Sequence, residues 1–142
     1  MDRGRDGRPD DAVPVGADEV IIAYRPERDG EPDPGEVVWT WVPYEDDPRR
    51  GKDRPVVVLG VAGSDLVVVP LSSRDHDGRR DAEEWIELGR GPWDPSDRVS
   101  FANVDRLLRV APAVVRREGA ILDRDRFERV VVGARRRHPD LT

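Results

Sequence analysis

Arg54 and Ser72 are the two polar side chains of the sequence whose spacing best suits joint action on a phosphate. Arg54 opens an apolar run that ends at Leu59, and Ser72 follows the next such run, Leu66–Leu71. The turn Gly63–Ser64 joins the two runs into a predicted β-hairpin, and antiparallel pairing brings Arg54 and Ser72 to one rim. A guanidinium binds phosphate oxygens bidentately and a hydroxyl adds one hydrogen bond, so the pair predicts a phosphodiester site. Both residue types are also common at strand boundaries for purely structural reasons.

Other catalytic and metal-binding motifs are mostly missing from the sequence. It contains no cysteine, which excludes disulfides and thiolate metal sites. Its two histidines are His76, in a predicted loop, and His138, which we expect beyond the ordered part of the last helix. No His, Asp or Glu residues are spaced as metal ligands usually are, and the glycines of Gly89–Trp93 do not open a phosphate-binding helix. We therefore predict neither a metal nor another cofactor.

The elements that must position Arg54 and Ser72 are short apolar runs separated by turn residues. Val37–Val42 is β-branched and aromatic, with Val37, Trp39 and Trp41 on one face, and a charged loop, Tyr44–Asp53, follows it. The second and third runs are apolar throughout, which predicts strands buried on both faces. Further strands are expected at 84–88, 99–104 and 106–110.

A helix is predicted to end the chain. Phe127, Val130, Val131 and Ala134 recur at helical spacing and should face the core. Asp123 suits the N-cap, and the arginines at 135–137 suit the last turn, where they complement the helix dipole. The sum is a mainly β (α+β) domain, a small antiparallel β-barrel with a C-terminal helix.

Residues 1–34 differ in composition from residues 35–142, which we take as the barrel domain. They hold 10 acidic and 5 basic side chains, and we expect a largely disordered acidic extension. Within it, the apolar run Asp18–Tyr24 could add an edge strand or a short helix. No apolar segment suits a signal peptide, and none approaches the roughly 18 residues of a membrane span. A cytoplasmic protein without membrane contact is the expectation.

The stretch GEVVWTWVPYEDDPRRGKDRPVVVLG, with VVVPLSS after it, resembles the MazF/PemK toxin family of bacterial type II toxin–antitoxin systems. The shared features are the first strand Gly35–Trp39, the Arg-Pro start of the second strand, Arg54–Leu59, and the third-strand end Pro70–Ser73. The resemblance implies an SH3-like barrel of the MazF/PemK/CcdB type that forms a homodimer and has a cognate antitoxin protein as partner.

The resemblance also implies metal-independent cleavage of single-stranded RNA, with Arg54 and Ser72 as the catalytic pair. The 2′-hydroxyl of the RNA attacks the adjacent phosphorus, so the enzyme supplies no nucleophile, and the guanidinium stabilises the developing charge. By the same resemblance the RNA-binding residues are predicted to be Arg49, Arg50, Lys52, Ser73 and Arg74.

Two features of the sequence depart from the family pattern. Ser72 stands where threonine is commoner, and it lacks the methyl group that stiffens χ1. The loop carries Glu45, Asp46 and Asp47, which would repel a phosphate backbone. The alternative hypothesis is therefore a catalytically weak or inactive barrel that binds nucleic acid or an antitoxin-like peptide.

Overall fold

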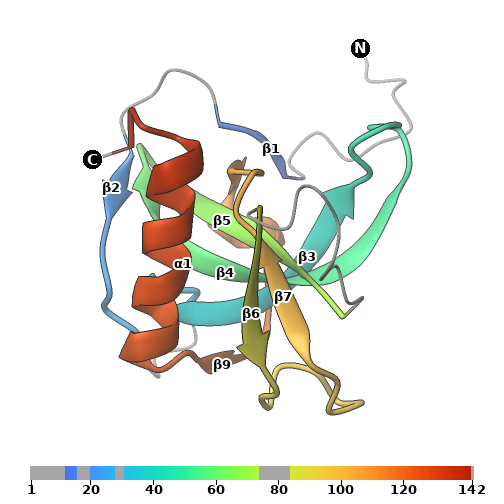
Figure 1. The fold of residues 1–142 in the computed structure, drawn as a ribbon. Coiled ribbons are helices and arrows are strands. Elements are labelled where there is room, and N and C mark those ends of the chain that lie inside the picture. Colours follow the sequence, from blue (N-terminus) through green and yellow to red (C-terminus); the bar gives the residue numbers. More distant parts are fainter. Residues whose placement is uncertain (1–11, 16–19, 28–30, 74–83, 142) are drawn as a thin grey trace.

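One helix packs against a twisted antiparallel sheet in the computed structural model, which describes residues 12–15, 20–27, 31–73 and 84–141 (Figure 1). In chain order the elements are β1 (Val13–Pro14), β2 (Ile21–Ile22), β3 (Glu36–Pro43), β4 (Gly51–Ala62), β5 (Asp65–Ser72), β6 (Trp85–Gly89), β7 (Ser100–Asn103), β8 (Leu108–Val110), a 3-10 turn (Pro112–Val114), β9 (Arg116–Ile121) and α1 (Arg124–Arg137).

The strand order of the sheet is β1-β8-β5-β4-β3-β9, and all of its pairings are antiparallel. β2 adds to β4, while β7 pairs with the end of β5 and carries β6 on its other side. The predicted mainly β fold with a C-terminal helix is confirmed. The described strands do not close into a complete barrel, because β1 and β9 end the path without pairing with each other.

Alternation along the strands divides the core into two clusters, one on each face of the sheet. Val37 lies in the cluster beneath α1, whereas Val38 and Val42 lie in the cluster on the opposite face. The second and third predicted strands bury both faces, as expected: every residue of Val56–Leu59 and Leu66–Leu71 is buried. The boundary of the charged loop was wrong by a few residues, because β4 already begins at Gly51 and pairs there with Pro43.

The helix α1 forms as predicted and covers the first cluster. The side chain of Asp123 accepts a hydrogen bond from the backbone N–H of Arg126, and Phe127, Val130, Val131 and Ala134 are buried. Gly133 has a packing role, because a Cβ placed there would lie 2.9 Å from Ile86 Cδ1. The missing side chain therefore lets α1 approach β6 closely. Within the described residues, no helix combines the length and apolar character that crossing a bilayer requires.

The described parts of the N-terminal segment contribute two short strands. Ile21 and Ile22 pair with Val61 and Gly60 of β4, so the apolar run adds an edge strand rather than a helix. The hydroxyl of Tyr24 donates a 2.8 Å hydrogen bond to the carbonyl oxygen of Leu122, and its ring packs 5.0 Å from that of Phe127. The expected disorder of residues 1–34 falls partly on 1–11, 16–19 and 28–30, which lie outside the described residues.

Candidate functional site

Arg54 lies in a row of polar residues that crosses three adjacent strands. Thr40 of β3 is its direct partner across the ladder. The pairing of β4 with β5 ends at Val56↔Pro70, and alternation along each strand puts Arg54 and Ser72 on the same face as that pair. Directly opposed residues project from the same face of a sheet, so Thr40, Arg54 and Ser72 share the face that lies away from α1. The local hairpin thus brings the two predicted side chains to one rim.

A depression of about 490 Å³ opens over this row. Its lining residues come from β4 and β5, from the end of β3 and the loop after it, from β6, and from the end of β7 and the turn after it. The side chains that line it belong to Pro43, Tyr44, Glu45, Lys52, Arg54, Pro70, Leu71, Ser72, Ser73, Trp85, Asn103 and Arg106. Arg54 and Ser72 are both half-buried, so each keeps a solvent-facing portion at this surface.

The predicted RNA-binding residues divide into two groups. Lys52 and Ser73 line the depression beside Arg54 and Ser72. Arg49 lies outside it, with a side chain that is 87% exposed and 3.7 Å from the carboxylate of Asp47.

Arg50 is also absent from the lining of the depression. Its guanidinium lies 5.7 Å from the ring centre of Tyr44, and the backbone N–H of Tyr44 bonds to the Arg50 carbonyl oxygen at 2.7 Å. Arg74, the last of the predicted RNA-binding residues, lies outside the described residues.

Only one of the three loop carboxylates lines the depression. Glu45 does so, while Asp46 is exposed outside the lining and Asp47 turns toward Arg49. The repulsion that the acidic loop was expected to exert on a phosphate is therefore concentrated at a single side chain.

Arg106 is a cation of the depression that the sequence analysis missed. It donates a hydrogen bond to the carbonyl oxygen of Pro43 at 3.1 Å, which ties the turn after β7 to the end of β3. Burial lowers the pKa of Arg106, and the nearby negative charge of Glu45 opposes that shift. A partly desolvated guanidinium with one hydrogen bond to a carbonyl oxygen is a ready partner for an anion entering from solvent.

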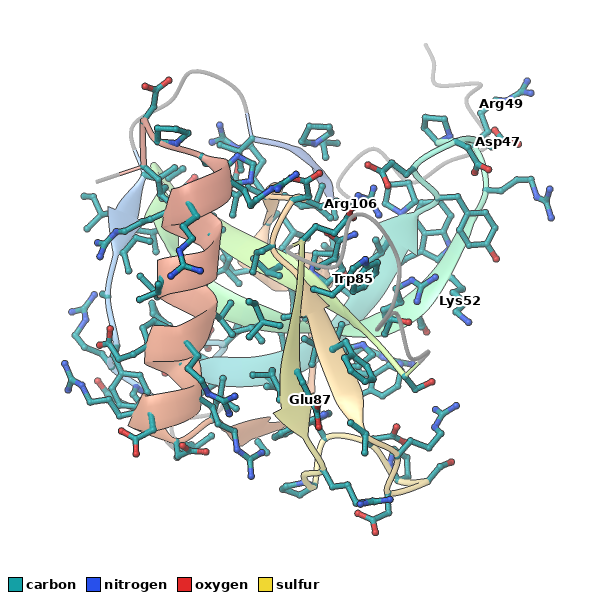
Figure 2. All side chains as sticks on the ribbon, viewed as in Figure 1. Asp47, Arg49, Lys52, Trp85, Glu87 and Arg106 are labelled. Carbon is teal, nitrogen blue, oxygen red and sulfur yellow. The ribbon has the colours of Figure 1, made fainter. Side chains whose placement is uncertain are left out.

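Trp85 and Asn103 were missed as well, and Figure 2 shows Trp85 and Arg106 together at one end of β6, with Glu87 further along the strand. The two missed residues pair with each other across β6 and β7. The turn that follows is held by the side-chain oxygen of Asn103, which accepts a hydrogen bond from the Asp105 backbone N–H at 3.1 Å. No local pattern marks these residues, because their place depends on the pairing of β7 with β5.

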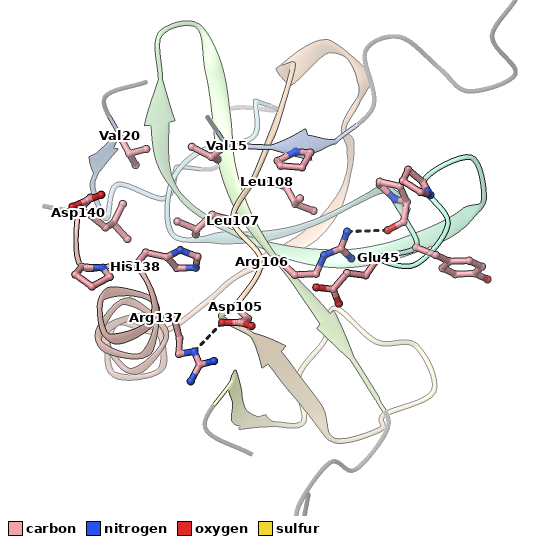
Figure 3. A pocket seen from close by; sticks show the side chains of 16 residues that line it. Val15, Val20, Glu45, Asp105, Arg106, Leu107, Leu108, Arg137, His138 and Asp140 are labelled. Atoms are coloured by element: carbon pink, nitrogen blue, oxygen red, sulfur yellow. Dashed lines mark hydrogen bonds and ion pairs between the residues drawn. The ribbon is translucent and has the colours of Figure 1, made fainter. Parts of the chain in front are cut away.

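A second, larger cavity of about 930 Å³ adjoins the depression and shares Arg106 and Glu45 with it (Figure 3). Its wall includes the end of α1, where Arg137 lies 2.8 Å from the Asp105 carboxylate. His138 directly follows the helix as its C-cap, and its Nε2 lies 2.9 Å from the carbonyl oxygen of Val104. This histidine therefore anchors the end of the helix to the residue that follows β7.

No metal-binding cluster is found in the part of the chain that the structure describes. There, no three histidine, aspartate or glutamate side chains gather closely enough to hold an ion. His76, the other histidine of the sequence, lies outside the described residues.

Comparison with known proteins agrees with this fold. A search of the curated proteins finds no match. The family model described as "PemK-like, MazF-like toxin of type II toxin-antitoxin system" matches residues 33–135, a span that contains β3 to β9 and most of α1. It therefore includes every residue that lines the depression, and it covers well over half of the chain. The chain belongs to the PemK-like, MazF-like family of type II toxin–antitoxin toxins.

Proposed function

We propose that this toxin is an endoribonuclease that cleaves single-stranded RNA without a metal ion, and that Arg54 and Ser72 act on the scissile phosphate. The observation that supports the proposal is that Arg54 and Ser72, on the same face of β4 and β5, both line one solvent-facing depression. A phosphate that enters this depression can therefore meet a guanidinium and a hydroxyl together.

The reaction needs no nucleophile from the protein. The RNA's 2′-oxygen attacks the adjacent phosphorus as the bond from phosphorus to the 5′-oxygen breaks. The 2′-hydroxyl gives its proton to solvent and the departing 5′-oxygen takes one, which leaves a 2′,3′-cyclic phosphate and a 5′-hydroxyl. Arg54 stabilises the charge that develops on the non-bridging oxygens, and the Ser72 hydroxyl holds the phosphate in line.

Further cations suit a polyanionic substrate. Lys52 and Arg106 line the same depression as Arg54, and among the described residues Glu45 is the one carboxylate there. Local charge of this kind steers an anion even when the whole chain carries a net charge of -6. By family membership we further propose a cognate antitoxin partner, a homodimeric assembly and a cytoplasmic site of action, with residues 35–142 as the working domain.

The test is an RNA cleavage assay in excess EDTA. The purified chain is compared with Arg54→Ala, Ser72→Ala and Arg49→Ala; the last removes one positive charge outside the depression. We expect cleavage by the wild type and Arg49→Ala, and a loss of about 10²-fold or more in Arg54→Ala. The product ends are identified by mass spectrometry. A fragment that ends in a 2′,3′-cyclic phosphate is lighter by one water than the same fragment with a linear 3′-phosphate.

Two results would contradict the proposal. Undiminished cleavage by Arg54→Ala would remove the assigned role of its guanidinium. No cleavage by any variant, with RNA or antitoxin-peptide binding retained, would favour the alternative of a binding module, which the carboxylate of Glu45 in the depression makes physically reasonable.

A further inference from the structure

Trp85 lies beside the proposed phosphate site. It opens β6, is half-buried, and lines the depression together with Arg54 and Ser72. Ser72 pairs with Phe101, and Trp85 pairs with Asn103 two residues further along the same strand. Because alternate residues of a strand share a face, the indole projects on the same side of the sheet as the Ser72 hydroxyl.

The other tryptophans serve different purposes, and the structure describes all four. Trp93 is 2% exposed, and its Nε1 donates to Ser100 Oγ at 2.9 Å. Trp39 donates its Nε1 hydrogen to the Trp93 carbonyl oxygen at 3.0 Å.

Trp41 stands on the Val37 face of β3, opposite to the face that carries Arg54. Its ring covers Gly51, where an added Cβ would lie 2.8 Å from the indole. Trp85 is thus the tryptophan that the fold turns toward the depression.

The separation between Trp85 and Ser72 suits one nucleotide. β6 is two strands away from β5, through β7, and neighbouring strands lie about 4.8 Å apart, so the two side chains are roughly 10 Å apart laterally. A phosphate held at Ser72 therefore places an adjoining base within reach of the indole. Arg106, in the same depression, provides a cation for the backbone that joins them.

We propose that Trp85 is the stacking platform for a base next to the scissile phosphate, so that the depression binds a single-stranded nucleotide rather than an isolated phosphate. This inference rests on the proposed function, since it supplies the base-binding part of the same RNA site. An indole stacks on every base, so Trp85 contributes affinity for unpaired strands and little sequence preference. A duplex, whose bases are already stacked, cannot use it.

The test measures binding without cleavage. Single-stranded oligo(dA) lacks the 2′-hydroxyl that the proposed reaction requires, and its Kd is measured by fluorescence anisotropy for the wild type, Trp85→Ala and Trp85→Phe. We expect Trp85→Ala to weaken binding by about 5- to 100-fold and Trp85→Phe to retain most of the affinity. An abasic oligomer of deoxyribose phosphates, which offers no ring, should bind to all three proteins equally.

A second readout covers the case in which Trp85→Ala fails to fold. Oligo(dA) should quench tryptophan fluorescence in the wild type, and Trp85→Phe should abolish the quenching while it still binds. Quenching that persists in Trp85→Phe, or equal affinities of wild type and Trp85→Ala for oligo(dA), would overturn the stacking role. Neither result would contradict the proposed role of Arg54 at the phosphate, which is tested separately by Arg54→Ala in the cleavage assay.

Discussion

Thr40 and Arg54 oppose each other directly across β3 and β4, and the Thr40 hydroxyl is buried beneath the site without a hydrogen-bond partner among the described residues. Thr40 is only 2% exposed, so solvent does not compensate for the missing partner. A buried hydroxyl without a partner carries a desolvation penalty of about 1–3 kcal/mol.

Thr40→Val should therefore raise the free energy of unfolding by about 1 kcal/mol, because valine keeps the shape and removes the desolvated oxygen. Urea denaturation monitored by tryptophan fluorescence measures the change. Thr40→Ser is the matched control, since it keeps the oxygen and loses a packed methyl group, and it should lower stability. A Thr40→Val protein less stable than the wild type would mean that a bound water satisfies the hydroxyl.

Arg106 should contribute one phosphate contact that depends on charge. Replacing it with glutamine should weaken binding of single-stranded oligonucleotides and reduce the slope of log Kobs against log salt concentration by about 0.7. Arg106→Lys should restore most of that slope because it restores the charge, although it loses the fork geometry that holds the Pro43 carbonyl. Arg49→Gln changes a residue outside the depression, and it should alter the slope less than Arg106→Gln does.

The ion pair between Arg109 and Asp65 should stabilise the hairpin of β4 and β5. Arg109 Nε lies 2.9 Å from an Asp65 oxygen, both side chains are largely buried, and Arg109 also donates to the Ala62 carbonyl oxygen at 3.1 Å. Arg109→Ala should lower the free energy of unfolding by about 1–3 kcal/mol, because it leaves a carboxylate and a carbonyl poorly solvated. Chemical denaturation measures the change.

The helix pair Arg124–Glu128 offers a control for that substitution. Its side chains are 68% and 52% exposed, so Glu128→Ala should change the free energy of unfolding by no more than about 0.5 kcal/mol. If Arg109→Ala and Glu128→Ala lowered the free energy of unfolding equally, desolvation would not be the reason that Arg109 stabilises the protein.

Gly60 should be needed for β2 to dock. A Cβ at this position would lie 2.0 Å from the Ile21 carbonyl oxygen, a backbone atom that moves only if the strand moves. Gly60→Ala should therefore release residues 20–27 from β4, which is measured as faster amide exchange in that segment and a lower melting temperature. Gly89→Ala is the control: its φ of 79° is strained for alanine, but no atom lies within 4 Å.

The hairpin and the helix could be predicted from the sequence because their signals are local. Arg54 and Ser72 are joined by one tight turn, and apolar runs on both sides fix the faces. The helix carries its own cap at Asp123 and its own periodicity. Such elements need no information about distant partners.

The walls of the depression could not be predicted in the same way. Trp85 and Arg106 reach the depression only because Ser72 pairs with Phe101, a residue far from it in the sequence. The shift in register between Val58 and Gly60 likewise lies where β2 pairs with Gly60, and the sequence left β2 open between strand and helix.

β7 pairs with β5 but follows it by many residues in the sequence, and this has a consequence for synthesis on the ribosome. A nascent chain that ends before Ser100 can already form the hairpin of β4 and β5, since that contact is local and forms quickly. It lacks the strand that pairs with Ser72 and the turn that carries Arg106. The depression is therefore assembled only after most of the chain has emerged, and an unfinished polypeptide presents Arg54 and Ser72 without the walls that would hold a nucleic acid against them.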